Sequence, residues 1–323
     1  MVALMACVST MLAGIASAGP AAADACSRHQ VGCFTFFTGI SDPQGITTGA
    51  DGALWFTSLN AIGRITTSGD LHEYTSARLF APGSITAGPD GALWFANGRS
   101  IGRIDLTGHF TFFHARGVAP SGGIATGPDG ALWFTNSLDS IGRITTAGQV
   151  TIYHDPTIAS PRDITAGPDG ALWFTNYGDH CRTVCGSIGR ITTRGKVTNF
   201  DPTINFYCGG AACGTAITSG PDGALWYTAV SDGIARITTR GRVTKHAAPG
   251  LTWDLTTGAD GALWFTNTGA SSIGRMTTGG HVNDFSDPRI GSPLNIVTGP
   301  DGAMWFTDAT NEQIGRVTTA VSS

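Results

Sequence analysis

The chain has 323 residues, of which 13% are charged, and its net charge is −4. This balance argues against the basic surface of a nucleic-acid-binding protein and against the polybasic patch of a protein held at a membrane surface. A hydrophobic content of 41% is typical of a globular chain and not of a disordered one.

The first 25 residues have the composition of a secretory signal peptide. They are largely apolar and small, and the triplets at 16–18 and 23–25 both match the small-x-small cleavage rule. The segment lacks the positive charge that usually begins a signal peptide. An uncleaved membrane anchor is the alternative, although the apolar run is short for a membrane span. We expect cleavage near Ala18 or Ala25 and secretion, to the extracellular space or the cell envelope.

An aromatic pair recurs along the rest of the chain and marks an internal repeat. Its tryptophans are spaced by 39, 39, 40, 53, 38 and 41 residues. A period near 40 residues is typical of repeat architectures such as propellers. The pairs are Trp55-Phe56, Trp94-Phe95, Trp133-Phe134, Trp173-Phe174, Trp226-Tyr227, Trp264-Phe265 and Trp305-Phe306.

Each copy contains four short runs separated by turn signals, as the fourth copy shows. A β-branched run at 163–167 leads into a Pro-Asp-Gly turn at 168–170, where proline presets φ and glycine tolerates positive φ. Runs at 171–175, 188–193 and 196–200 follow. No helical period occurs, so each copy predicts one four-stranded antiparallel sheet. Seven copies predict an all-β, seven-bladed β-propeller that residues 26–323 form as a single domain.

The last copy lacks its fourth run, and the other end of the chain supplies one. The copy ends with the third run at 314–319. Residues 33–37 (Cys-Phe-Thr-Phe-Phe) resemble residues 109–113 (His-Phe-Thr-Phe-Phe), which are the fourth run of another copy. We therefore expect the N-terminal strand to complete the last blade, which removes an open sheet edge from the ring.

Residues that recur in most copies are explained by the scaffold. The turn aspartates shape turns, the repeated arginines are expected to bind carbonyls or carboxylates between blades, and the aromatic pairs pack between sheets. The third residue after each tryptophan forms a mostly amide set, for which loop capping and ligand binding both remain open. This set is Ser58, Asn97, Asn136, Asn176, Ala229, Asn267 and Asp308. Function is expected from unrepeated residues on one face of the ring.

The 53-residue spacing comes from two insertions that strand alternation places on one face. Residues 177–186 lengthen a loop of blade four, and residues 206–214 lengthen the linker to blade five. Loops of this length are usually functional, and neutral decoration is the alternative. The first insertion contains Asp179 and His180, which together with Arg162-Asp163 on the preceding linker offer an acid–base pair. A solvated histidine beside an aspartate is the alternative there.

Six cysteines lie beyond the N-terminal segment, and four of them are in these insertions. An even number in an exported chain predicts disulfides. The pairs Cys181/Cys185 and Cys208/Cys213 suit a four-thiolate zinc site only in a reducing environment, and such sites usually have tighter spacing. Disulfides are therefore favoured, with their pairing open. The candidates are Cys26, Cys33, Cys181, Cys185, Cys208 and Cys213.

The repeat resembles that of the virginiamycin B lyase (streptogramin lyase) family. The motif Ile-Thr-x-Gly-Pro-Asp-Gly-Ala-Leu-Trp-Phe-Thr, followed by Ile-Gly-Arg-Ile-Thr-Thr-x-Gly, carries the resemblance over about residues 33–319. The resemblance implies a seven-bladed propeller. It also implies a lyase that opens a cyclic depsipeptide antibiotic by magnesium-assisted elimination at the ester C–O bond. Carboxylates hold a hard cation, the cation stabilises charge on the ester carbonyl, and histidine takes the proton.

The chain departs from that family where the resemblance places the catalytic groups. The lyase has a Pro-His-Ala-Ile segment opening its penultimate repeat, a Glu-Pro-His-Gly-Ile segment opening its last, and a glutamate beyond the last aromatic pair. Here Trp253 and Leu294 stand at the histidine positions and Ser292 at the first glutamate position. Asp308, one residue early, is the carboxylate that could serve as catalytic residue and metal ligand. We expect most of the lyase site to be missing, and Mg²⁺ as a cofactor only if lyase activity is retained.

Three functions follow from these observations. The first is a secreted, monomeric propeller that binds a small molecule, peptide or glycan, with Trp253 as a stacking anchor or as ordinary packing. The second is an enzyme with a relocated acid–base site, for which the catalytic candidates are Asp308, His180 and Asp179. The third is the lyase reaction itself. No nucleic-acid partner, and no membrane insertion after signal cleavage, is expected. The candidate ligand-binding residues are Trp253, Asp254, Arg162, Asp163, Asn176, Tyr177, Asn267 and Asn295.

Overall fold

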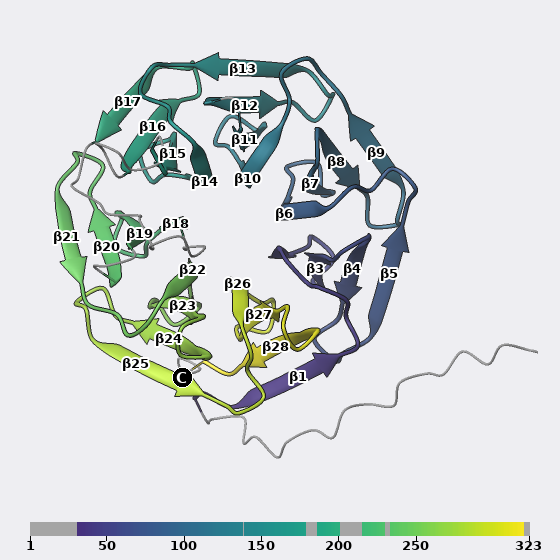
Figure 1. The fold of residues 1–323 in the computed structure, drawn as a ribbon, viewed down its shortest axis with the longest axis vertical. Helices are drawn as coiled ribbons and strands as arrows, with labels where there is room; N and C mark the ends of the chain where they lie inside the picture. The colour runs from purple at the N-terminus through teal and green to yellow at the C-terminus, as the bar shows by residue number, and fades with distance from the viewer. Residues whose placement is uncertain (1–30, 138, 179–185, 201–214, 230–232, 320–323) are drawn as a thin grey trace, which may run out of the picture.

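Seven four-stranded antiparallel sheets form a ring around a central axis (Figure 1). The computed structural model describes residues 31–137, 139–178, 186–200, 215–229 and 233–319. These residues form 28 strands and no helix, and within them no helix is long and apolar enough to cross a membrane. The predicted all-β, seven-bladed propeller is confirmed. The signal segment at 1–25 lies outside the described ranges and stays a prediction.

The strands follow one another from the inside of each blade to its rim. Blades one to three contain β2 (Ile46–Thr48), β3 (Leu54–Thr57), β4 (Ala61–Ile65), β5 (Leu71–Thr75); β6 (Pro82–Ala87), β7 (Leu93–Asn97), β8 (Ser100–Ile104), β9 (Phe110–Phe113); and β10 (Pro120–Thr126), β11 (Leu132–Asn136), β12 (Ser140–Ile144), β13 (Val150–His154). Blades four and five contain β14 (Pro161–Ala166), β15 (Ala171–Asn176), β16 (Ser187–Thr192), β17 (Val197–Phe200); and β18 (Ile217–Ser219), β19 (Leu225–Ala229), β20 (Gly233–Ile237), β21 (Val243–His246). Blades six and seven contain β22 (Thr252–Thr257), β23 (Leu263–Asn267), β24 (Ser272–Met276), β25 (Val282–Ser286); and β26 (Pro293–Thr298), β27 (Met304–Asp308), β28 (Gln313–Val317), β1 (Phe34–Thr38).

Blade seven is built from both ends of the described chain. Strand β1 pairs antiparallel with β28, from Phe34 opposite Val317 to Thr38 opposite Gln313, and Figure 1 shows purple β1 beside yellow β28. The side chains of Phe34 and Phe36 are buried, with their rings edge-on to Phe306 at 6.3 and 6.2 Å between centroids. The predicted closure by the N-terminal strand is confirmed.

Each interface between blades buries the tryptophan face of one sheet against the phenylalanine face of the next. Between blades one and two, Trp55 packs in one apolar cluster with Phe95, and both side chains are fully buried. On the opposite face of blade one, the Phe56 ring lies directly over Gly63, so that a Cβ at Gly63 would overlap it. This contact explains the glycine in the repeated Ile-Gly-Arg motif. Six further clusters of the same kind complete the ring.

The turn aspartate of each blade joins a tryptophan and an arginine. In blade one, Asp51 Oδ1 accepts a hydrogen bond from Trp55 Nε1 at 3.1 Å, and Asp51 Oδ2 pairs with Arg64 Nε at 2.6 Å. The far edge of the blade contributes Tyr74, whose ring stacks on the indole at 5.4 Å. We call the linked aspartate, tryptophan and arginine of each blade (Asp51, Trp55 and Arg64 in blade one) the Asp–Trp–Arg clasp. The repeated arginines therefore bind carboxylates as expected, but within a blade instead of between blades. The seven ion pairs are Arg64–Asp51, Arg103–Asp90, Arg143–Asp129, Arg190–Asp169, Arg236–Asp222, Arg275–Asp260 and Arg316–Asp301.

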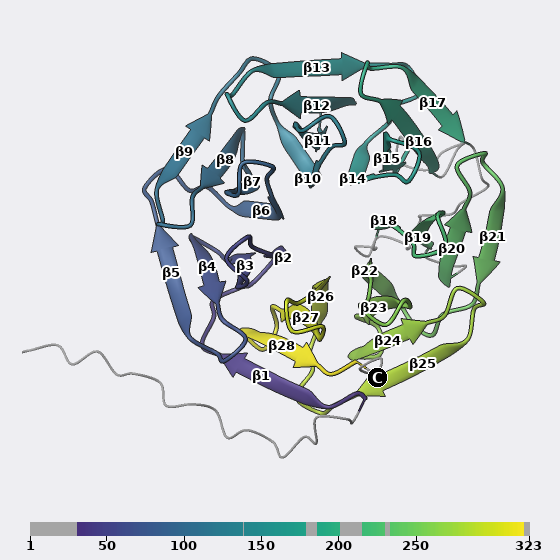
Figure 2. The same ribbon diagram turned by 180° about the vertical axis from the view of Figure 1, so that it is seen from behind.

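The innermost strands surround the axis and contact one another in sequence, with β26 contacting β2 (Figure 2). The threonine of the Trp-Phe-Thr motif bridges neighbouring blades here. Thr57 Oγ1 accepts a hydrogen bond from the backbone N–H of Gly45 at 2.9 Å and donates to the carbonyl of Gly83, in the next blade, at 2.7 Å. Thr175, Thr266 and Thr307 repeat the donation to the following blade. These hydrogen bonds hold the innermost strands of neighbouring blades together around the central axis.

Replacing Phe36 by alanine should destabilise the fold by about 3 kcal/mol, because it removes a buried ring from the strand that closes blade seven. The measurement is urea unfolding followed by tryptophan fluorescence. Thr38→Ala, on the exposed end of the same strand, is the control and should change the unfolding free energy by less than about 0.5 kcal/mol. Equal stabilities for F36A and the parent would contradict the closure.

Acid should weaken the clasps. Burial opposes the ionisation of Asp129, but hydrogen bonds from Trp133 and Arg143 outweigh burial and hold the pKa of Asp129 below its usual 3.8. A lowered folded-state pKa contributes stability that is present above 3.8 and is lost as pH falls through the folded-state value. Arg143→Met should therefore cost about 1–2 kcal/mol at neutral pH, and this cost should shrink in acid. Urea unfolding of the parent and R143M across an acid pH series tests this, and a cost independent of pH would contradict it.

Candidate functional site

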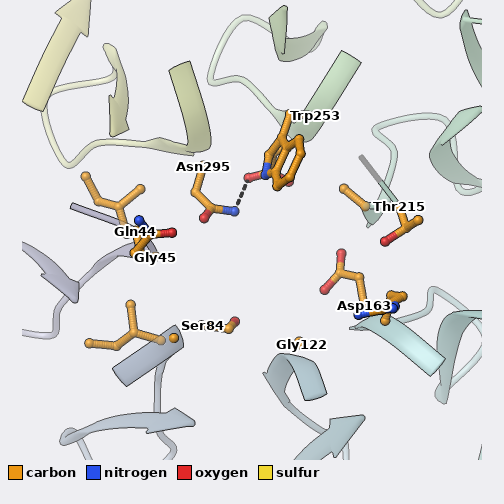
Figure 3. Close-up of a pocket in the computed structure, with 15 residues that line it drawn as sticks. Gln44, Gly45, Ser84, Gly122, Asp163, Thr215, Trp253 and Asn295 are labelled. Carbon is orange, nitrogen blue, oxygen red and sulfur yellow. Dashed lines mark hydrogen bonds between the residues drawn. The ribbon is translucent and has the colours of Figure 1, made fainter. Parts of the chain in front are cut away.

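A cavity of about 330 Å³ lies on the axis of the ring, enclosed by the innermost strands of the blades. Every blade contributes at least one residue to its wall, and Figure 3 shows these side chains converging on the open centre. The volume lies at the lower end of the range for small-molecule sites. The lining residues are Gln44, Gly45, Ile46, Gly83, Ser84, Ile85, Gly122, Gly123, Arg162, Asp163, Thr215, Ala216, Trp253, Asp254 and Asn295.

A β-bulge turns the first residues of the innermost strands toward the cavity. In blade four, Pro161 pairs with Asn176 and the next registered pair is Ile164 with Phe174. Arg162 and Asp163 therefore stand opposite a single residue of β15, and such a bulge re-aims side chains. The same register shift occurs in β6, β22 and β26, and in β10 the shift is larger, with three residues between Pro120 and Ile124. In these five blades the bulge therefore places cavity-lining residues at the starts of the innermost strands. Blades one and five have no such shift, and there Gly45 and Ala216 directly precede β2 and β18.

The residue before the aliphatic residue of each innermost strand differs between blades. This position is surrounded by repeated scaffold on both sides, so it is free to vary without disturbing the interfaces between blades. In chain order it carries Gly45, Ser84, Gly123, Asp163, Ala216, Asp254 and Asn295. Two of the seven are carboxylates, and both belong to the set predicted from the sequence.

Asp254 is the better-satisfied of the two carboxyl groups. Its Oδ1 accepts a hydrogen bond from the Leu255 N–H at 2.8 Å. Its Oδ2 accepts from the Ile296 N–H at 2.9 Å and from Asn295 Nδ2 at 3.0 Å, both in blade seven. Burial raises the pKa of Asp254 to about 6, against the lowering effect of these donors. Asp254 therefore links blades six and seven as well as lining the cavity.

Asp163 makes the equivalent link between blades four and five with one donor fewer. Its Oδ1 accepts from the Ile164 N–H at 2.8 Å and its Oδ2 from the Ile217 N–H at 2.9 Å. Ala216 occupies the position that corresponds to Asn295, so no side-chain amide reaches Asp163. Burial is the main cause that raises the pKa of Asp163 to about 7, and the negative charge of Asp254 is the second cause. The two carboxyl groups are thus near enough to oppose each other's ionisation.

Trp253 and Arg162 complete the predicted part of the site. Trp253 is half-buried and lines the cavity beside Asp254, and Figure 3 shows its indole between Asn295 and Thr215 in that view. Arg162 is exposed at the rim, where its guanidinium lies 5.4 Å from the centre of the Tyr177 ring. The structure therefore brings together Arg162, Asp163, Trp253, Asp254 and Asn295, which the sequence singled out. Sequence reasoning missed Gln44, Ser84 and Thr215, although their positions vary between copies.

The predicted asparagines serve the scaffold. Asn176 Oδ1 accepts from the Ala159 N–H at 3.2 Å, and its Nδ2 donates to the Thr157 carbonyl at 3.0 Å, which fixes the linker before β14. Asn267 Nδ2 donates in the same way to the Pro249 carbonyl at 2.6 Å. Both side chains are buried and neither lines the cavity. Of the two interpretations of this set, the contacts favour loop capping.

Asp308 occupies the equivalent capping position in blade seven. It is fully buried, and its Oδ1 accepts from the Ser292 N–H at 2.9 Å while its Oδ2 accepts from the Gly291 N–H at 2.8 Å and Gln313 Nε2 at 2.9 Å. It does not line the cavity. Its assignment to catalysis or to a metal stays a prediction that these contacts do not favour.

Several predicted residues lie outside the described ranges. These include Asp179 and His180, so the proposed acid–base pair is not placed. The cysteines other than Cys33 lie outside them as well, and the disulfide pairing stays a prediction.

A second cavity, of about 350 Å³, adjoins the first and shares Gln44 and Gly83 with it. Its wall includes Leu59.

Comparison with known proteins decides the family. The model of the virginiamycin B lyase family matches residues 24–206 and 207–322. The chain belongs to the virginiamycin B lyase family. This confirms the resemblance carried by the repeat.

Solved structures agree with this membership. A streptogramin B lyase structure is 31% identical to the chain, with a TM-score of 0.76, and covers 88% of this chain and 97% of its own. Virginiamycin B lyase from Staphylococcus aureus is 32% identical, with the same TM-score, covering 88% and 99%. Hydrazine synthase from Kuenenia stuttgartiensis, at 16% identity and a TM-score of 0.72 over 88% and 98% of the chains, shares the fold. No curated protein matched in a separate search.

The residues at the family's catalytic positions do not fit a magnesium ion. Trp253, Leu294 and Ser292 provide neither a histidine nor a carboxylate there, and both oxygens of Asp308 already accept hydrogen bonds from N–H donors. Within the part of the chain that the structure describes, no group of three or more His, Cys, Asp or Glu residues could hold a metal.

The two cavity carboxyl groups should titrate as a coupled pair. Carboxyl ¹³C NMR of the protein should show Asp163 changing near pH 7 and Asp254 near pH 6. In Asp254→Asn the titration of Asp163 should move to lower pH, because the opposing charge is gone. Glu73→Gln, on the exposed outer strand β5, removes the same charge far from the cavity and should leave Asp163 unchanged. Titration of both groups near pH 4 would contradict this.

Proposed function

We propose that this member of the virginiamycin B lyase family is a secreted binding protein whose ligand occupies the axial cavity. The observation that carries the proposal is the convergence of unrepeated residues on one cavity: Asp163, Asp254, Trp253 and Asn295 break the repeat and line it together. Pockets that combine an aromatic wall with a few placed polar groups are typical of small-molecule sites. Secretion is supported by the apolar composition of the first 25 residues.

The structures of relatives bear on the alternative. The similar structures are of lyases by name, which favours C–O lyase activity here by membership alone. Against it, Trp253 and Leu294 cannot act as the proton-abstracting bases that the family resemblance places there. The binding proposal requires no such groups and uses Trp253 as it stands.

A second candidate is an enzyme that transfers a proton through Asp163. The observation in its favour is the pKa of Asp163 near 7, which suits a general acid or base at neutral pH. The paired Asp254, with a lower pKa near 6, would remain ionised while Asp163 carries the proton, and this is a common division of roles in carboxylate pairs. The two candidates share one cavity and differ in whether turnover follows binding.

A defined panel of amines, carboxylic acids, dipeptides and monosaccharides, screened by saturation-transfer NMR, tests the binding proposal. Compounds that bind should lose at least about tenfold in affinity in Trp253→Ala, because the aromatic wall is removed. Leu59→Ala, in the neighbouring cavity, is the matched control and should bind as the parent does.

Three outcomes, from this screen and from a separate antibiotic assay, discriminate the alternatives. Binding that is unchanged in W253A would contradict the axial site. Incubation with a streptogramin B antibiotic, with and without Mg²⁺, should leave the ring closed, and ring opening would show that the family's lyase reaction persists. Chemical change of any bound panel compound, lost in Asp163→Asn, would favour the acid–base enzyme.

A further inference from the structure

The axial cavity has an excess of negative charge. Among its lining residues the charged side chains are Arg162, Asp163 and Asp254. The Arg162 guanidinium lies over the Tyr177 ring at the exposed rim. Figure 3 shows the Asp163 carboxyl group directed at the open centre. The interior of the cavity is therefore anionic.

Neither carboxyl group is paired with a cation by the part of the chain that the structure describes. The donors to Asp163 are the N–H groups of Ile164 and Ile217, and those to Asp254 are two N–H groups and the Asn295 amide. Neutral donors orient a carboxylate but do not cancel its charge. Two enclosed carboxylates that oppose each other are costly to ionise, and a bound cation would remove that opposition.

The remaining wall suits a cation that has an apolar part. The Trp253 indole offers an aromatic face, which attracts both apolar groups and ammonium ions. The Asn295 amide nitrogen is used by Asp254, while its side-chain oxygen accepts no hydrogen bond from the described residues and lines the cavity. An ammonium group has three N–H donors, and the two carboxyl groups together with this oxygen supply acceptors for them.

We propose that the axial cavity binds a small organic ammonium ion, with its ammonium group between Asp163 and Asp254 and its apolar part against Trp253. This rests on the proposed binding function and names its ligand class. A volume of about 330 Å³ is far larger than a bare metal ion needs, and hard metal ions prefer walls made wholly of oxygen. The indole in the wall therefore favours an organic cation.

Binding of such a cation should depend on pH in a defined direction. The residues that line the cavity from blades one, two, three, five and seven do not titrate, and those with polar side chains are Gln44, Ser84, Thr215 and Asn295. Blades four and six supply Asp163 and Asp254, and Arg162 lies at the rim. The ammonium ion binds the ionised pair, so affinity should rise as pH rises through the range in which the pair loses its protons.

Isothermal titration calorimetry with 2-phenylethylamine as probe tests the proposal, with 2-phenylethanol as its neutral counterpart. The amine should bind at least about tenfold more tightly than the alcohol, since hydrogen bonds between charged partners are stronger than those between neutral ones. Its affinity should increase about a hundredfold from pH 5.5 to pH 8, because the fraction of protein in which both carboxyl groups are ionised rises by that factor. Binding at pH 6.5 should release protons, detected by comparing two buffers of different ionisation enthalpy.

Variants and competitors separate the possible failures. Asp163→Asn and Asp254→Asn should each weaken amine binding at least tenfold, while Glu73→Gln should not. If the alcohol binds as tightly as the amine and both are lost in W253A, the ammonium inference fails and the binding function stands. If Mg²⁺ or Ca²⁺ binds to the pair and displaces the amine at equal concentration, the cavity takes a metal ion and the inference also fails. The pH series of the parent protein decides the matter even if a variant does not fold.

Discussion

Closure of the ring is the constraint on which the rest of this structure depends. Seven sheets close without a gap only if every interface has nearly the same thickness and angle, so each blade repeats one packing of Trp face against Phe face. The Asp–Trp–Arg clasp holds the indole of each blade in a fixed position for that packing. Most of the sequence is committed to this repetition. Residues that can vary are those that point away from the interfaces, and the axial cavity is where such residues meet.

The fold was largely predictable from the sequence because its signals are local and repeated. The Pro-Asp-Gly turn, the aromatic pair and the Ile-Gly-Arg run recur at a steady period, and each has a direct structural meaning. Even the closure by β1 was visible, because residues 33–37 match the fourth run of another copy. The partner of the repeated arginines was only partly predictable. Whether the arginine reaches a carboxylate of its own blade or of the next depends on the strand register, which places Arg64 opposite Trp55 and so beside Asp51.

The site was predictable in its members and not in its geometry. Trp253, Asp254, Asp163 and Asn295 attracted attention as departures from the repeat, and they line one cavity. That Asp163 and Asp254 oppose each other's ionisation could not be read from residues two blades apart, because it depends on the width of the axis and on the bulge before Ile164. The amide set shows that a variable position need not belong to the site. Asn176, Asn267 and Asp308 form hydrogen bonds to the backbone of the linkers and do not line the cavity.

The pairing of β1 with β28 also bears on how the chain folds. The backbone N–H of Cys33 donates to Thr318 Oγ1, across 285 residues of sequence, so β1 is held by a segment that is synthesised much later. Contacts between such distant segments close a long loop and form slowly. Six blades can form from neighbouring strands as the chain emerges, whereas the seventh must wait until β28 has been synthesised. A chain cut short before β28 therefore cannot close the ring and keeps the unpaired edge of β1 exposed.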